Sequence, residues 1–92
     1  MIKMALICYS DSNFTGAANF FIKATKIDTT DGGLYYNVAC CFSRIGKIDK
    51  SFEWLNVAIQ KGYNDYQWIN NDPDLFNVRQ DRRWEEFIKI KK

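Results

Sequence analysis

The stretch IDKSFEWLNVAI, residues 48–59, decides the fold, because its apolar residues recur with the period of an α-helix. Ile48, Phe52, Leu55 and Ile59 stand at positions i, i+4, i+7 and i+11. This spacing is typical of an amphipathic helix that buries one face. Gly46, two residues upstream, can adopt the left-handed conformation that closes a preceding helix. The pattern predicts a helix over about 48–61 that follows a tight turn.

The same pattern occurs earlier in the chain, with Phe14 in the place of Ile48. The matching residues are Phe14, Ala17, Ala18, Phe21 and Ala24. The offset between the two sets is 34 residues, from Phe14 to Ile48. At the same offset upstream, Ala5 corresponds to Ala39, Cys8 to Phe42 and Ser12 to the turn residue Gly46. Asn13 is suited to cap the helix that begins at Phe14. We therefore expect two helix–turn–helix units, with helices at about 2–10 and 14–27 and at about 33–45 and 48–61.

Small residues recur where the two helices of each unit should approach closely. They are Ala5 and Ala39 on the first helices, and Ala17, Ser51, Ala24 and Ala58 on the second helices. A larger side chain at such a position would push the helices apart and destabilise the unit by overpacking. Phe21 and Leu55 are expected to fill the remaining space.

The pattern does not continue into a third unit. Pro73 stands where that unit would carry its small residue, and proline disrupts a helix interior. The sequence instead predicts short helices, with caps at Asn64, Asp72 and Asp81. We expect these helices to cover the end of the second unit with apolar side chains. The covering residues would be Leu75, Phe76, Val78, Trp84 and Phe87. Trp68 is also expected in the core, with a ligand contact as the alternative.

A repeat period of about 34 residues, small residues on both helices, a turn glycine and large residues between them together resemble the tetratricopeptide repeat. The C-terminal stretch contains Gly62-Tyr63, then Asn71-Asp72-Pro73-Asp74-Leu75, then Trp84 after Asp81-Arg82-Arg83. With these motifs it resembles the segment that closes some bacterial tetratricopeptide proteins. The resemblance implies one all-α domain over 1–92, in which antiparallel helix pairs stack as a short right-handed solenoid. Its parts would be a first repeat at 1–31, a second at 32–63 and a helical cap at 64–92. The alternative is two unrelated helical hairpins whose spacing coincides.

The resemblance also implies a function, which is to bind a protein or peptide in a concave groove lined by the first helix of each repeat. In this sequence the faces of those helices that internal packing does not use should carry the contacts. The candidate partner-binding residues are Leu6, Tyr9, Tyr36, Cys40, Ser43 and Arg44. Tyrosine and arginine are common anchors of protein interfaces.

The composition favours a binding module over an enzyme. The 92 residues are 47% hydrophobic and 26% charged, which is typical of a globular domain and not of a disordered segment. The chain has no histidine and no glycine-rich phosphate loop. Its three cysteines, two of them adjacent, lack metal-site spacing. We expect no catalytic activity, no cofactor and no metal ion.

Three further expectations concern partners and location. The apolar N-terminal helix would lack a covering element, which predicts self-association through that edge. The competing function is nucleic-acid binding by the basic C-terminal helix, which would use Arg79, Arg82, Arg83 and the terminal lysines, with Trp84 for stacking on bases. A net charge of +2 argues against it. The short apolar run at 1–8 looks superficially like a signal peptide, but it lacks a cleavage site and is too short for a membrane span. We therefore expect a cytoplasmic protein.

Overall fold

The structure is a computed structural model that describes residues 7, 9 and 11–91 of the chain. Within these residues all regular secondary structure is helical, as expected. The elements are α2 (Phe14–Ile27), α3 (Gly32–Arg44), α4 (Ile48–Gln60), α5 (Tyr66–Ile69), the 3-10 helix η1 (Pro73–Leu75), α6 (Phe76–Arg79) and α7 (Arg83–Lys91). The helix predicted at 2–10 lies almost wholly outside the described residues.

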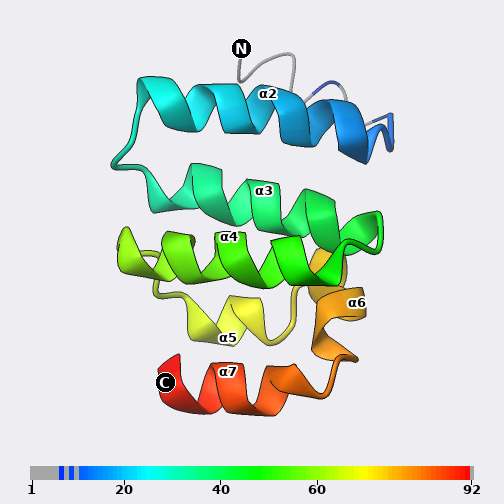
Figure 1. Cartoon of the computed structure of the whole chain (residues 1–92), viewed down its shortest axis with the longest axis vertical. Coiled ribbons are helices and arrows are strands. Elements are labelled where there is room, and N and C mark those ends of the chain that lie inside the picture. The colour runs from blue at the N-terminus through cyan, green and yellow to red at the C-terminus, as the bar shows by residue number, and fades with distance from the viewer. Residues whose placement is uncertain (1–6, 8, 10, 92) are drawn as a thin grey trace.

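Helices α2, α3 and α4 lie side by side with alternating directions, and α3 is the middle one (Figure 1). One side of α3 packs Leu34, Val38 and Cys41 against α2. Its other side packs Ala39 and Cys40 against α4 and the C-terminal segment. Because α3 is covered from both sides, it is the most buried helix of the fold.

Turns and caps place these helices as the sequence predicts. The Asn13 side chain accepts a hydrogen bond from the Gly16 amide at 3.0 Å, which caps α2. Gly46 has φ +80°, in the left-handed region, and Ser12, at the corresponding position of the first unit, has φ 61°. The two turns therefore share an unusual backbone conformation, although only one of them contains glycine.

The predicted close approach between helices is confirmed in the second unit, whereas that of the first unit involves a helix that lies almost wholly outside the described residues. Ala17, Ala24, Ala39, Ser51 and Ala58 are all buried, while Ala5 lies outside the described residues. Ser51 Oγ donates a hydrogen bond to the Ala39 carbonyl at 2.9 Å, which joins α4 to α3 where both side chains are small. Phe21 and Leu55, at corresponding positions, are both buried.

The C-terminal segment follows the prediction in outline and departs from it at three residues. Leu75, Val78, Trp84 and Phe87 are buried, but Phe76 is 57% exposed and Trp68 is 46% exposed. The prediction that these two lie in the core is wrong. In the one-turn helix α5 the inward position belongs to the buried Ile69, and at the junction of η1 and α6 it belongs to Leu75 and Val78. The α5 cap is Asp65 and not Asn64.

Replacing Gly46 with alanine should lower the free energy of unfolding by about 1–2 kcal/mol, because an L-residue is disfavoured in the left-handed region. A Cβ atom at Gly46 would meet no atom within 4 Å, so the effect is purely conformational. Gly46→Asn should cost less, since asparagine tolerates this conformation. Urea unfolding of both variants measures the difference, and equal stability of the two would contradict this explanation.

Candidate functional site

Tyr36, Cys40 and Ser43 lie on one face of α3, but this face is covered. All three side chains are buried. The covering segment is η1 with α6, both of which contact α3 (Figure 1). The prediction that these three residues are exposed in an open groove is therefore wrong, because their side chains are buried. The chain's own C-terminal segment fills the space where a partner was expected.

A buried carboxylate, Asp72, holds this segment against α3. Its Oδ2 atom accepts a hydrogen bond from the Tyr36 hydroxyl at 2.5 Å and from the Cys40 thiol at 3.7 Å. Its Oδ1 atom accepts from the Asp74 amide at 2.9 Å, which caps η1. Asp72 is only 3% exposed, so the fold replaces its hydration with donors of the protein.

The donors of this cluster keep their protons. Burial raises the pKa of Tyr36, and nearby negative groups add to the shift. Burial, followed by the charge of Asp72, likewise raises the pKa of the Cys40 thiol. Burial raises the pKa of Cys41 to about 12. A nucleophilic cysteine requires the thiolate, and burial disfavours that form at both Cys40 and Cys41.

At the edge of the same face, Asp74 brings together the two remaining described candidates, Tyr9 and Arg44. The Tyr9 hydroxyl donates to Asp74 Oδ2, and Arg44 Nε donates to Asp74 Oδ1 at 2.9 Å. The Arg44 guanidinium also lies 4.9 Å from the centre of the Phe14 ring, which Tyr9 meets edge-on. The Arg44 side chain remains 45% exposed, so it is open to a partner.

Ser43 anchors α6. Its Oγ atom accepts a hydrogen bond from the Val78 amide at 3.2 Å, and its carbonyl accepts one from Asn77 Nδ2 at 2.8 Å. Arg79 Nη1 then donates to the carbonyls of Ile69 and Asp72 at 3.1 and 2.6 Å. The segment is thus tied to α3 and to itself by polar contacts as well as by Leu75 and Val78.

The predicted site is therefore divided. Tyr9 and Arg44 meet at the rim, Tyr36, Cys40 and Ser43 are buried beneath the C-terminal segment, and Leu6 lies outside the described residues. The binding role of the six residues stays a prediction. The sequence pattern identified Asp72 only as a helix cap. Its second role, as the acceptor for α3, had no local signal, because its partners precede it by more than thirty residues.

Cys40, Asp72 and Asp74 place three ligand-type atoms within 4.8 Å of one another. The carboxylate oxygens already accept hydrogen bonds from Tyr36, Tyr9 and Arg44. A metal ion would also require Cys40 to lose its proton, against the direction of its pKa shift. The geometry of this cluster is that of a hydrogen-bonded network. The expectation that the chain binds no metal stays a prediction.

The stacking surface proposed for nucleic acid is wrong. Trp84 is buried and packs against Phe52 and Phe87. Arg83 forms ion pairs with Asp49 at 2.7 Å and with Asp81 at 2.9 Å. The ring that should stack on bases is thus part of the core, and one of the three arginines is already neutralised by two carboxylates.

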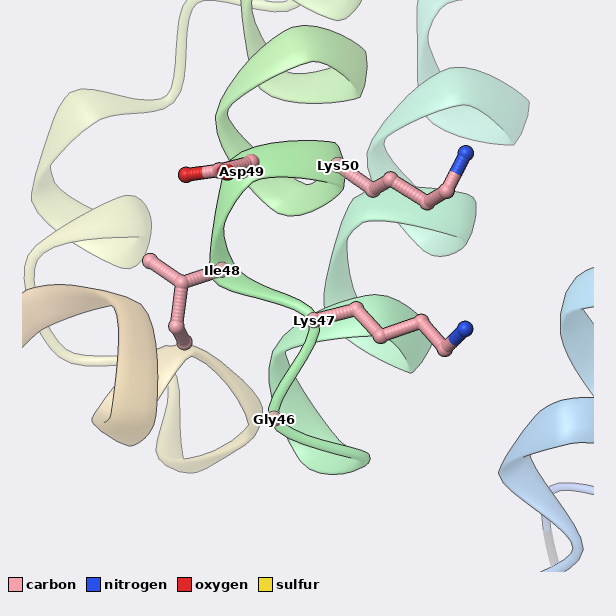
Figure 2. A pocket seen from close by; sticks show the side chains of 5 residues that line it. All are labelled: Gly46, Lys47, Ile48, Asp49 and Lys50. Atoms are coloured by element: carbon pink, nitrogen blue, oxygen red, sulfur yellow. The ribbon is translucent and has the colours of Figure 1, made fainter.

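A hollow of about 420 Å³ lies at the start of α4 and is lined by residues 46–50. Figure 2 shows that Lys47 and Lys50 extend to the same side of α4, whereas Asp49 extends to the opposite side. The first turn of α4 has no side-chain cap. Lys47, Lys50 and Asp49 all line this hollow, so its lining carries charges of both signs.

Comparison with known proteins gives two partial similarities. The chain is 30% identical over 66 residues to a protein named "Tetratricopeptide repeat protein 30 homolog" from Caenorhabditis briggsae, which covers 72% of this chain and 10% of the relative. It is 35% identical over 54 residues to a chloroplast protein from Arabidopsis thaliana, which covers 59% of this chain and 16% of that protein. No family model and no solved structure matches. The chain thus spans a small part of each relative.

No helix among the described residues combines the length and the apolar character that a membrane crossing requires. The predicted cytoplasmic location is untested, and the Arabidopsis relative carries a chloroplast designation in its own name.

Proposed function

We propose that this chain is a tetratricopeptide-type helical repeat module that binds a protein or peptide and performs no catalysis. The observation that carries the proposal is the repetition of buried positions at one fixed offset along the chain. Ala17, Phe21 and Ala24 on α2 correspond to Ser51, Leu55 and Ala58 on α4, and all six are buried. Similarity to a tetratricopeptide protein over 72% of the chain supports it.

The proposed architecture is a short right-handed solenoid, with repeats at 1–31 and 32–63 and a cap at 64–92. Antiparallel packing of α2, α3 and α4 supports stacking of successive helix pairs. A repeat array needs a terminal element that covers the apolar face of its last unit. The burial of Ile69, Leu75 and Val78 against α3 and α4 supports this role for the cap.

Within this proposal, the rim residues Arg44 and Tyr9 are the accessible part of the partner-binding set. Arginine is enriched among residues that dominate binding energy, and Arg44 is half-exposed beside an aromatic ring. Tyr36 and Cys40 would support the rim from below through Asp72, and Ser43 through its hydrogen bonds to α6. Self-association through the N-terminal helix stays a separate prediction, because most of that helix lies outside the described residues.

Affinity capture from a native lysate, quantified by mass spectrometry, tests the proposed function. The tagged chain should enrich a defined set of proteins over a tag-only control. Arg44→Ala should lower their recovery about tenfold, as expected for an interface anchor. Arg82→Ala, which removes an exposed arginine from the cap, serves as the matched control and should leave recovery unchanged. If nothing is enriched over the tag alone, the proposed function is wrong.

A further inference from the structure

One face of α4 carries a surface stripe that internal packing leaves accessible. Its members are Lys47, Lys50, Trp54, Val57 and Lys61, at i, i+3, i+7, i+10 and i+14. At 100° per residue these positions fall within a sector of about 80°. The three lysines are exposed, whereas the tryptophan and valine between them are half-buried. We refer to these five residues as the outer stripe of α4.

The middle of the outer stripe is an apolar platform. Trp54 stacks on Tyr35 of α3 with ring centres 5.7 Å apart, and Phe42 lies 6.5 Å from Trp54 on the other side. A hollow of about 280 Å³ opens here, lined by Tyr35, Glu53, Trp54 and Val57. Half-buried rings around a hollow offer an apolar side chain a place to be removed from water.

Positive charge flanks the platform at both ends. Lys50 Nζ lies 5.9 Å from the centre of the Phe42 ring, and Lys61 Nζ lies 5.7 Å from that of Tyr35. Within the described part of the chain, every ion pair is formed by Arg44 or Arg83, and none by a lysine of the stripe. The ammonium groups of Lys50 and Lys61 thus lie over aromatic rings, and within the described residues neither forms an ion pair with a carboxylate.

Two acidic residues of α4, Asp49 and Glu53, differ in their position relative to the stripe. Asp49 extends to the side opposite Lys47 and Lys50 (Figure 2), where it pairs with Arg83 at 2.7 Å. Glu53 lines the hollow together with Tyr35, Trp54 and Val57. The stripe is thus a positive surface with an apolar centre and one carboxylate beside that centre.

We infer that the outer stripe of α4 docks a peptide segment that has acidic residues near both ends and one apolar residue between them. The apolar side chain would enter the hollow beside Trp54. This inference rests on the proposed function and adds to the rim residues Arg44 and Tyr9 a second docking surface with its own partner class. Lys50 and Lys61 are separated by about 16 Å along the helix axis. An extended peptide spans that distance with about five residues. Its acids would therefore lie over the lysines when its central side chain lies over Trp54.

Charge and shape favour this occupant over a polyphosphate backbone. Phosphates repeat at short, regular intervals, so a strand along the stripe would place one beside Glu53. A peptide avoids that repulsion by keeping its centre apolar. Binding of nucleic acid or of an anionic membrane would instead depend on the lysines alone and not on the platform.

The test uses the full chain, labelled with nitrogen-15, and the probe acetyl-Asp-Glu-Gly-Phe-Gly-Glu-Asp-amide. Amide and indole shifts should concentrate at Tyr35, Trp54 and Val57. Lys50→Glu combined with Lys61→Glu should weaken binding at least tenfold. The matched control is Lys26→Glu combined with Lys89→Glu, which makes the same charge change at exposed sites away from the stripe. It should change the affinity less than twofold, and thermal melting checks that both variants are folded.

Three results overturn the inference: no shifts at the platform, equal loss in both double variants, or unchanged binding when glycine replaces the central Phe of the probe. Tighter binding of a twelve-residue oligothymidylate, or of phosphatidylglycerol vesicles, than of the peptide would assign the stripe to another partner class. Lysate capture distinguishes failure of this inference from failure of the proposed function. If the variant with Lys50→Glu and Lys61→Glu keeps every captured partner while Arg44→Ala loses them, the proposed function stands through the rim, and the stripe docks none of these partners, which contradicts the inference.

Discussion

Replacing Leu55 with alanine is expected to lower the free energy of unfolding by about 3–5 kcal/mol. Leu55 is fully buried in the cluster where α4 meets α3 and the C-terminal segment. Truncation removes buried methyl groups and leaves a cavity that the packed neighbours cannot close. A domain of this size has a total stability of only about 5–10 kcal/mol, so the variant should be partly unfolded near body temperature.

The corresponding position of the first repeat provides an internal comparison. Phe21→Ala should cost a similar amount, because Phe21 is buried between α2 and α3 at the position that corresponds to Leu55. Ile27→Ala, at a side chain that is 74% exposed, should change stability by less than about 0.5 kcal/mol. Urea unfolding followed by circular dichroism measures all three. A loss below about 1 kcal/mol for Leu55→Ala would contradict this packing of the core.

Replacing Asp72 with alanine is expected to cost about 3–5 kcal/mol, although Asp72 is a polar residue. The change removes the cap of η1, which alone is worth about 1 kcal/mol. It also leaves the buried Tyr36 hydroxyl and Cys40 thiol without their acceptor. A buried donor without a partner costs about 1–3 kcal/mol, with the weak thiol at the low end. Asp72→Asn keeps an acceptor oxygen and should cost about half as much.

Thiol labelling distinguishes a local effect at this cluster from general destabilisation. In Asp72→Ala the C-terminal segment should release α3, so Cys40 should react faster with a thiol reagent well below the melting temperature. Asp74→Asn is the matched control, because it removes a rim carboxylate whose ion pair with Arg44 is partly solvated and worth about 1 kcal/mol or less. Unchanged stability and an unreactive Cys40 in Asp72→Ala would refute the anchoring role.

The helices were predictable because their signals are local. The positions of α2, α3 and α4 follow from apolar spacing, and the turn at Gly46 from the one residue type that adopts its backbone conformation without strain. The exposure of Phe76 and Trp68 was not predictable in this way. In helices of one turn, the period is too short to indicate which residue faces inward, and tertiary packing decides.

The candidate site was less predictable than the fold for a related reason. Helical periodicity tells which residues share a face, and it correctly grouped Tyr36, Cys40 and Ser43. It does not tell what covers that face. Polar side chains such as these are typical of a solvent-exposed groove, and here their partners Asp72 and Val78 stand 32 to 36 residues downstream. Only the tertiary structure shows that the hydrogen-bond partners of these side chains come from the chain's own C-terminal segment.

The central position of α3 also has a consequence for how the chain folds. Its contacts with α2 and α4 join segments that are neighbours along the chain, so little loop entropy opposes them, and such contacts typically form within microseconds to milliseconds. The hydrogen bond between Tyr36 and Asp72 closes a much longer loop. We therefore expect the three long helices to assemble first and the Asp72 segment to dock last. During unfolding, release of that segment would be the earliest opening detected by hydrogen exchange.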